Sequence, residues 1–380
     1  MELYIHPYIF YHGRYGGIAR YVCELAEQHE QMGVRVHLPI EHSESVYLAA
    51  SSFFARTAQE TPTAPWWMRL AASCLPSAGL KTRAKRYIMR QRALQALQQG
   101  QYDIIHPSYT NCTEIIPHIH NTPLVVTVHD MIHELYPHAF SQADPTALRK
   151  REFINRADKI IAISHKTKED LVNICGVDEA KIDVVYHGNS LVLPPDATSR
   201  KLDLPERYIL FVGHRFGYKN FSVLLRAFAH LAAKDKELQL ICAGGPDFSQ
   251  AEWQEMNELG LAGKVHRKQV SDDVLAILYH RSLCFVYPSM YEGFGLPILE
   301  AYSCGAPVIC ANASCFPEIA GNGAIYFHPD KVDDLTSAIE SVITSSSERT
   351  RLLQAGAERL AQFSWRQSAE ATLGVYRSVL

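Results

Sequence analysis

Residues 289–301 read SMYEGFGLPILEA, and they place Glu292 and Glu300 eight positions apart around a Gly-Phe-Gly turn and a proline. The preceding residues 285–288 end a predicted strand. A helix is expected to begin at Leu296, because a proline is tolerated in the first turn, where its missing amide hydrogen is not needed. The glycines would then lie at a helix N-terminus, where free N–H groups and the positive end of the helix dipole bind phosphate.

The two carboxylates of this stretch need a different partner, because they would repel a bare phosphate. An ionised carboxylate is a pure hydrogen-bond acceptor, so the hydroxyls of a sugar and a ribose suit Glu292 and Glu300. A nucleotide-sugar would satisfy the glycines and both carboxylates together. The alternative is a surface loop with solvated glutamates before an ordinary helix.

The composition of the 380-residue chain is that of a globular protein with two or three domains, at roughly 150 residues per domain. The formal net charge of -3 argues against a nucleic-acid-binding protein with a basic surface. The nine cysteines include no C-x-x-C pair, which argues against a zinc ribbon or a disulfide framework and predicts a reducing compartment. Without a signal-like N-terminus or a run of about 18 apolar residues, we expect a cytoplasmic protein that is neither secreted nor membrane-spanning.

Short apolar runs alternate along the chain with longer segments of helical periodicity, which is typical of βαβ units and parallel sheets. Residues 188–199 separate two series of predicted strands, because turn formers and two prolines there interrupt any helix or central strand. The predicted strands are 3–9, 34–40, 102–107, 123–128, 159–163 and 182–186, followed by 208–213, 238–243, 264–267, 283–287 and 307–311. We therefore predict an α/β protein with two doubly wound, Rossmann-like domains and a ligand cleft between them.

The segment from Glu292 to Glu300 resembles the E-x7-E motif of the retaining glycosyltransferases of family 4, which have the GT-B fold. The resemblance implies that Glu292 lies near the donor sugar and that Glu300 binds the ribose. It also implies an acceptor-side domain at 1–190, a nucleotide-sugar domain at 200–362 and a last helix, 363–380, that crosses back to the first domain. Further donor-binding residues implied by the resemblance are Ser289, Gly293, Phe294, Gly295, Leu296 and, near the nucleotide base, Val270, whose neighbours could equally be a helix N-cap.

Residues 208–220 resemble a second element of that family, G-x-R-x-x-x-K-N. A predicted strand runs into Gly213, and Arg215 and Lys219 follow before the next predicted helix. Two cations beside a strand end suit a diphosphate, the arginine through its planar fork and the lysine as a compact charge. The resemblance assigns both side chains to the donor diphosphate, and a solvated loop with two cations is the alternative.

Gly16 and Gly17 follow the first predicted strand and precede a helical segment. The surrounding residues do not match G-x-G-x-x-G, so a dinucleotide fingerprint is not predicted. The two residues resemble the Gly-Gly loop of the family, which approaches the donor phosphate and the acceptor, and Arg14 is expected on the acceptor side. A purely structural turn is the alternative.

His129 and Asp130 end a predicted strand and are expected to point into the cleft. His129 and His133 have the i, i+4 spacing of a metal site, but the segment is not H-E-x-x-H and shows no obvious third ligand, so no metal is predicted. The resemblance places His129 at the donor hexose, and Asp130 is a weaker candidate on the acceptor side. A satisfied interior histidine is the alternative for His129.

A basic stretch lies between residues 61 and 102, which include no Asp or Glu. It contains seven positive charges and two neighbouring tryptophans, namely Trp66, Trp67, Arg69, Lys81, Arg83, Lys85, Arg86, Arg90 and Arg92. Aromatic residues beside a basic helix are typical of membrane-surface elements, in which each cation contributes on the order of 1 kcal/mol near an anionic surface. We therefore predict contact through 66–92 with the inner face of the cytoplasmic membrane, and an exposed basic helix over a packed loop is the alternative.

Together these resemblances imply a metal-independent retaining glycosyltransferase without a cofactor, which moves a hexose from a nucleotide-sugar to an acceptor hydroxyl. The sequences around His129 and Lys219 resemble bacterial mannosyltransferases that build lipopolysaccharide O-antigen or exopolysaccharide. This implies GDP-mannose as donor and a saccharide acceptor, free or linked to polyprenyl diphosphate. UDP-sugars and GDP-deoxysugars stay open as donors, and a non-hydrolysing UDP-sugar epimerase or a catalytically silent nucleotide-binding subunit stays open as the function.

Overall fold

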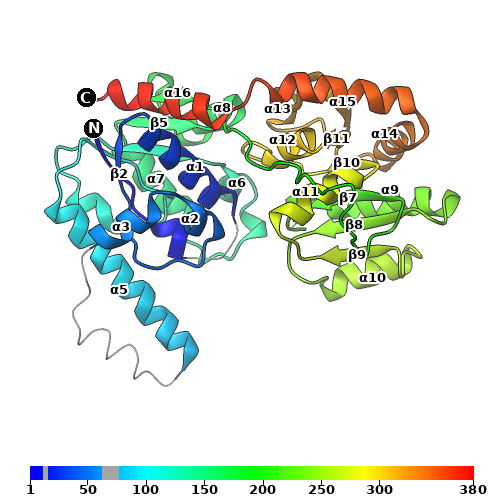
Figure 1. Ribbon diagram of the computed structural model, residues 1–380, viewed down its shortest axis with the longest axis horizontal. Coiled ribbons are helices and arrows are strands. Elements are labelled where there is room, and N and C mark those ends of the chain that lie inside the picture. Colours follow the sequence, from blue (N-terminus) through cyan, green and yellow to red (C-terminus); the bar gives the residue numbers. More distant parts are fainter. Residues whose placement is uncertain (12–15, 62–76, 216) are drawn as a thin grey trace.

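The computed structural model describes residues 1–11, 16–61, 77–215 and 217–380, which form two α/β halves side by side (Figure 1). The strands of the N-terminal half are β1 (Glu2–Tyr4), β2 (Arg35–His37), β3 (Ile104–Ile105), β4 (Val125–Val128), β5 (Lys159–Ala162) and β6 (Ile182–Val184). The strands of the C-terminal half are β7 (Tyr208–Val212), β8 (Gln239–Ala243), β9 (Val265–Lys268), β10 (Cys284–Tyr287), β11 (Val308–Ala311) and β12 (Ala324–Phe327). Every predicted strand range overlaps one of them, whereas β12 was not predicted.

The C-terminal half contains one six-stranded parallel sheet in the order β12-β11-β10-β7-β8-β9. Its central strands are buried on both faces, which explains why their sequences are continuous apolar runs rather than alternating ones. After β9 the chain returns to the other side of β7, so the strand order reverses between β7 and β10. A ligand crevice is expected at such a reversal, beyond the carboxyl ends of the strands.

The sheet of the N-terminal half consists of two three-stranded parallel parts, β2-β1-β3 and β4-β5-β6, joined by a single bridge between Ile105 and Leu124. The predicted strand at 3–9 is too long, because residues Tyr8–Tyr11 form a 3-10 helix. Pro7 explains the early end of the strand: it cannot donate to the ladder, and its carbonyl accepts a 3.0 Å bond from the amide of Phe10.

Helices lie around both sheets. Those of the N-terminal half are α1 (Gly17–Gln31), α2 (Val46–Ala50), α3 (Phe54–Glu60), α5 (Ala78–Gln99), α6 (Ile132–Leu135), α7 (Thr146–Arg156), α8 (His165–Cys175) and α16 (Trp365–Arg377). Those of the C-terminal half are α9 (Phe221–Lys234), α10 (Gln250–Glu258), α11 (Asp272–Arg281), α12 (Leu296–Ser303), α13 (Phe316–Ala320), α14 (Val332–Thr344) and α15 (Ser346–Leu360).

The last helix, α16, returns from the C-terminal half and lies along the N-terminal half (red in Figure 1). Its residues Trp365 and Tyr376 belong to the same buried cluster as the apolar face of α1. Two histidines of the N-terminal half fix the helix further. His29 Nε2 donates to the carbonyl of residue 369 at 3.1 Å, and His106 Nδ1 bonds the hydroxyl of Tyr376 at 2.6 Å. The first half is therefore completed by the end of the chain.

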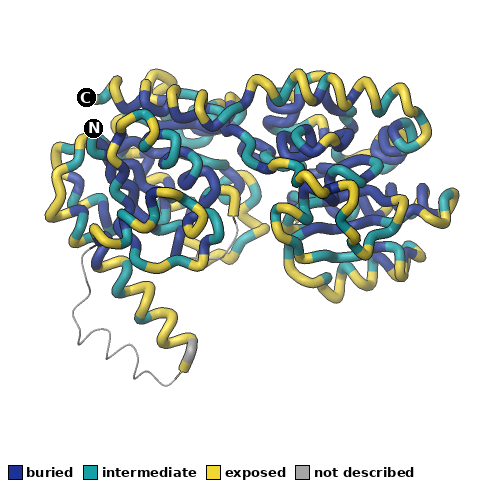
Figure 2. The backbone as a smooth tube through the Cα atoms, in the orientation of Figure 1, coloured by how far each residue is buried: buried dark blue, intermediate teal, exposed yellow. Residues whose placement is uncertain are grey.

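Helix α5 projects from the N-terminal half, and most of its residues before Arg90 are exposed (Figure 2). Its base is attached by ion pairs of Arg90 with Glu114 and of Arg92 with Glu41. None of the described helices combines the length and the apolar composition that a membrane span requires. The two tryptophans and Arg69 of the predicted membrane-contacting stretch lie outside the described residues.

Candidate functional site

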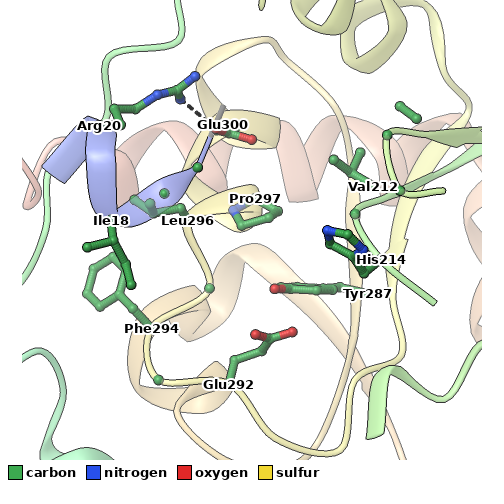
Figure 3. A pocket seen from close by; sticks show the side chains of 18 of the residues that line it. Ile18, Arg20, Val212, His214, Tyr287, Glu292, Phe294, Leu296, Pro297 and Glu300 are labelled. Carbon is green, nitrogen blue, oxygen red and sulfur yellow. Dashed lines mark hydrogen bonds and ion pairs between the residues drawn. The ribbon is translucent and has the colours of Figure 1, made fainter. Parts of the chain in front are cut away.

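A pocket of ≈ 830 Å³ lies between the two halves, at the carboxyl ends of β7 and β10 (Figure 3). The C-terminal half contributes the charged side chains Lys219, Asp272, Glu292 and Glu300. The N-terminal half contributes Gly16 and His129, among others. The pocket therefore lies where the reversal of strand order predicts a ligand.

Lys219 is positioned by the short connection between β7 and α9. Asn220 precedes the helix with a φ of 57°, a left-handed conformation that asparagine tolerates better than most residues. Its side-chain amide donates to the carbonyl of Pro329 at 2.7 Å, which fixes the turn. Lys219 Nζ lies 2.5 Å from Glu292 Oε1, so the lysine and the first glutamate of the motif form one ion pair at the pocket wall.

The loop after β10 is held in place from two sides. The Ser314 hydroxyl donates to the carbonyl of Glu292 at 2.7 Å and accepts from its amide at 3.2 Å. A Cβ on Gly293 would lie 1.7 Å from the carbonyl oxygen of His129, so only glycine allows this approach of the opposite half. Gly295 has a φ of 93° and precedes the first residue of α12, which confirms the predicted helix start. The free amides of this N-terminus therefore lie at the pocket.

Glu300 lies on α12, with its side chain 10% exposed. Burial raises the pKa of this carboxyl, while Arg20 and Tyr279 oppose that shift. Arg20 Nη1 donates to Glu300 Oε1 at 2.7 Å, and the Tyr279 hydroxyl donates to Oε2 at 3.2 Å. These two donors favour the ionised form of a carboxylate that water reaches poorly.

His129 directly follows β4 on the other side of the pocket. Burial lowers its pKa to about 4, so the imidazole is neutral at pH 7. Its ring lies in a T-shaped arrangement with that of Tyr21 at a centroid distance of 5.1 Å, and the centroid of the His187 ring lies 6.0 Å away. His187 also lines the pocket, and burial lowers its pKa as well. The wall formed by the N-terminal half is thus uncharged at its histidines and suited to hydrogen bonds with hydroxyls.

The two halves touch directly beside the pocket. The Ser164 hydroxyl donates to the carbonyl of Gly293 at 2.7 Å, and the Tyr291 hydroxyl donates to Asp170 at 2.6 Å. Glu318 accepts from the amide of His165 at 2.7 Å, at the N-terminus of α8, where a carboxylate is favoured by the helix dipole. The loop that carries Glu292 is therefore held by residues of the opposite half.

The structure brings most of the predicted site residues together around one pocket. Those that line it are Gly16, Gly17, His129, Asp130, Lys219, Val270, Glu292, Gly293, Phe294, Gly295, Leu296 and Glu300. Ser289 is fully buried and does not line it, and Arg14 lies outside the described residues.

Arg215 does not line the pocket either. Its Nε donates to Glu252 at 2.6 Å, its Nη2 donates to the carbonyl of Pro246 at 2.6 Å, and its side chain is 2% exposed. The guanidinium also lies over the ring of Phe248 at 4.6 Å. These contacts attach Arg215 to the segment after β8, and its role at a diphosphate stays a prediction.

The pocket also includes residues that were not predicted, among them Arg20, Tyr47 and His187. Arg20 lies one helical turn after Gly16, so the spacing alone could have placed it on the same face. His187 directly follows a predicted strand. The same position at a strand end identified His129 as a candidate. Tyr47 gives no comparable signal, because α2 reaches the pocket only through the tertiary fold.

His129 and His133 have the i, i+4 spacing of two metal ligands on a helix. The structure separates the two side chains, because His133 stacks on Phe140 at a centroid distance of 3.8 Å and lines a different pocket. Among the residues that the structure describes, no three His, Cys, Asp or Glu side chains gather as a metal-binding group.

Two family models match the chain, one in each half. The model described as "Glycosyltransferase Family 4" matches residues 15–191, and "Glycosyl transferases group 1" matches residues 196–359. A D-inositol 3-phosphate glycosyltransferase of Nocardioides sp. is 31% identical over 77% of this chain and 70% of its own length. The O-antigen chain mannosyltransferase RfbU of Salmonella typhimurium is 31% identical over 59% of this chain, and O-antigen chain mannosyltransferase B of Escherichia coli is 28% identical over 60%. The chain covers 63% and 62% of the length of these two mannosyltransferases, which is under two thirds.

Solved structures show the same fold. A sucrose-phosphate synthase from Thermosynechococcus elongatus superposes with a TM-score of 0.75 at 22% identity, covering 99% of this chain and 98% of its own. Anabaena HepE, solved with UDP and glucose, superposes with a TM-score of 0.73 at 19% identity, covering 99% of both chains. The chain therefore belongs to the group 1 glycosyltransferases, and its two halves have the GT-B fold.

Proposed function

We propose that this chain transfers a hexose from a nucleoside diphosphate sugar to a saccharide acceptor, with retention of the anomeric configuration. The observation that carries the proposal is a single pocket that holds Lys219, the amides of residues 293–295, Glu292 and Glu300 opposite the neutral imidazole of His129. Each group suits one part of the donor. The cation and the amides suit the diphosphate, Glu300 suits the ribose, and His129 and Glu292 suit the sugar.

The difficult step in such a transfer is departure of the diphosphate as positive charge develops on the sugar carbon. Groups fixed around the leaving group stabilise the negative charge that develops there, and they do so without reorganising at the moment of reaction. Asn220 and Ser314 fix the segments that carry Lys219 and the N-terminus of α12, which supports this role. Glu292 orients the sugar, and we assign it no role as a covalent nucleophile.

The reaction needs no metal ion in this proposal. Lys219 and the helix N-terminus supply the positive potential that a magnesium ion supplies in many other phosphate sites. Activity should persist in the presence of EDTA, and restoration by added magnesium of activity lost to EDTA would contradict this part of the proposal.

The proposed donor is GDP-mannose, because the names of two relatives record mannose transfer. A UDP-hexose is the second candidate, and it is favoured by the fold neighbour solved with UDP and glucose. A GDP-deoxysugar also fits the groups that line the pocket. The nucleotide is the part of the donor that can be tested without knowing the acceptor.

The proposed acceptor is a saccharide linked to a lipid diphosphate, bound while α5 lies on an anionic membrane surface. The exposed part of α5 carries Lys81, Arg83, Lys85 and Arg86, which have no acidic partner among the described residues. Tyr87 is 58% exposed beside them. A basic helix with an exposed aromatic side chain is suited to an anionic interface.

Thermal unfolding with GDP, UDP, dTDP and ADP, with and without magnesium, tests the proposal first. A ligand at about 100 times its Kd adds roughly 2.7 kcal/mol of stability. We expect a selective shift with GDP that does not depend on magnesium. Selective stabilisation by UDP would move the donor to a UDP-hexose, and the absence of any shift would contradict the site.

Product analysis separates transfer from the two other functions. An epimerase would convert a UDP-sugar without an acceptor, and a silent subunit would bind nucleotide and form no product. We expect a glycosylated acceptor, with the anomeric configuration of the donor seen by NMR. Inversion of that configuration would contradict the retaining mechanism.

A further inference from the structure

Arg20 lies on α1 of the N-terminal half, but its guanidinium is bound mainly to the C-terminal half. Nη1 donates to Glu300 Oε1 at 2.7 Å, as the dashed line in Figure 3 marks, and Nη2 lies 2.5 Å from Asp272 Oδ2. Nη2 also donates to the Tyr47 hydroxyl at 3.0 Å. The side chain is 8% exposed, so a cation buried from water joins two carboxylates across the pocket.

The start of α1 explains how the arginine reaches this position. The amide of Arg20 donates to the carbonyl of Gly16 at 3.0 Å, so the two residues are one helical turn apart on the same face. Gly16, Gly17 and Arg20 all line the pocket. The glycines bring the helix end to the cleft, and the arginine extends from there to α11 and α12.

The contacts of Glu300 show what Arg20 does to it. Arg20 occupies one carboxylate oxygen, and the Tyr279 hydroxyl occupies the other. A carboxylate has about four acceptor positions, so these two bonds fix its plane and leave capacity for further hydroxyl donors from the pocket. Tyr279 belongs to the same half as Glu300, whereas Arg20 does not.

We propose that Arg20 is a positioning residue for the nucleotide: it holds the Glu300 carboxylate in the orientation that accepts the ribose hydroxyls, and it does so from the opposite half. The inference rests on the proposed function, since it takes Glu300 as the ribose-binding group. Its consequence is that the ribose site of the C-terminal half is complete only while α1 lies against it. Binding of the ribose and contact between the halves should then favour one another, because coupling of this kind is reciprocal.

A merely structural ion pair predicts something different. Loss of such a pair would loosen the protein and weaken every ligand of the pocket alike. A residue that acts through Glu300 should affect only ligands that offer ribose hydroxyls. A nucleotide without those hydroxyls therefore separates the two explanations.

The experiment measures binding of GDP and of 2′,3′-dideoxy-GDP by isothermal titration calorimetry to the wild type, Arg20→Ala and Arg20→Lys. UDP and 2′,3′-dideoxy-UDP replace them if UDP is the nucleotide that the wild type binds. We expect Arg20→Ala to weaken the binding of GDP by about tenfold or more and the binding of dideoxy-GDP by less than about threefold. Arg20→Lys, which keeps a cation without the planar fork, should recover part of the loss and serves if the alanine variant does not fold.

Two further variants frame the result. Tyr279→Phe removes the other donor to Glu300 and should give a smaller loss of the same ribose-dependent kind. Arg366→Ala breaks the exposed ion pair with Glu370 on α16 and should leave the affinity for both nucleotides unchanged. In turnover assays, Arg20→Ala should raise the donor KM more than it lowers kcat.

The assignment of Arg20 would be overturned if the Arg20 variants bound GDP and dideoxy-GDP equally more weakly, or if they bound both as the wild type does. The pocket would remain the nucleotide site in either case. Failure of the wild type to bind GDP, UDP, dTDP or ADP would overturn the proposed function itself, and the inference with it.

Discussion

The two halves share one architecture but face the pocket with different chemistry. The C-terminal half presents Lys219, Glu292 and Glu300, charged groups that lie at the ends of an unbroken six-stranded sheet. The N-terminal half presents His129 and His187, imidazoles that burial keeps neutral, while the charge of its Arg20 is bound to Glu300 and Asp272. The difference shows how a pair of similar folds can divide one ligand: the half with fixed charges suits the nucleotide diphosphate, and the half with neutral donors and acceptors suits sugars.

The buried histidines make the N-terminal half the acid-sensitive one, and this is the largest effect we expect. Burial lowers the pKa of His6 and His106 to about 3 and that of His29 and His129 to about 4, against 6.5 in the unfolded chain. Below pH 6.5 the unfolded chain therefore binds protons that the folded half does not, and stability is lost as the pH falls from 6.5 toward 4. At pH 5 the loss is roughly 2 kcal/mol for each histidine.

Hydrogen exchange at pH 7 and pH 5, corrected for the intrinsic rate and resolved by peptide, measures this loss. Protection of β4 and β5 should fall far more than protection of β7 and β8. His29→Gln, which keeps a side-chain donor near residue 369, should reduce the pH dependence by about one proton. An equal loss of protection in both halves would contradict the greater acid sensitivity of the N-terminal half.

Lys219→Ala tests the charged half. We expect turnover to fall about 30-fold to 1000-fold, which corresponds to roughly 2 to 4 kcal/mol of transition-state stabilisation. The other lysine or arginine that lines the described pocket, Arg20, is bound to Glu300 and Asp272 and does not replace the charge. Lys234→Ala is the matched control, since this lysine forms an exposed pair with Glu340 on the outer surface of the same half. Near-wild-type turnover in Lys219→Ala, measured at saturating donor, would contradict the role of the lysine.

Gly293→Ala tests the contact between the halves. The added Cβ would meet the carbonyl of His129, which is backbone and cannot move alone, so we expect a loss of about 1 to 3 kcal/mol in unfolding free energy together with lower activity. At Gly16 an added Cβ meets no atom within 4 Å, and Gly16→Ala should leave the thermal midpoint unchanged. Equal midpoints for Gly293→Ala and the wild type would show that the halves separate there without cost.

The smallest effect concerns α5. Arg86→Gln should weaken binding to vesicles that contain anionic lipid by about fivefold, since one cation near such a surface contributes roughly 1 kcal/mol. Arg366→Gln on α16 is the matched control on the same half. Vesicle sedimentation in low and high salt measures the binding of both variants. If Arg86→Gln binds vesicles like the wild type, α5 is not the contacting element.

The same division marks what the sequence could predict. In the C-terminal half, two short continuous motifs each set a turn and its side chains, so α12 begins where it was predicted and Lys219 and Glu292 both line the pocket. Arg20 was not, because its partners Glu300 and Asp272 lie more than 250 residues away and meet it only after both halves fold. The strand β12 was missed although Ile325 and Tyr326 give an apolar run after a glycine turn. The pairing of Arg215 with Glu252 could not be predicted from the sequence either, and the role of Arg215 at a phosphate stays a prediction.

A crystal structure of the chain with a bound nucleoside diphosphate tests the central claim most directly. The account predicts ribose hydroxyls about 2.5 to 3 Å from the Glu300 carboxylate, with the diphosphate within hydrogen-bond distance of Lys219 and the amides of residues 293–295. A nucleotide bound elsewhere, or one in this pocket with its ribose away from Glu300 and its diphosphate away from Lys219, would contradict it.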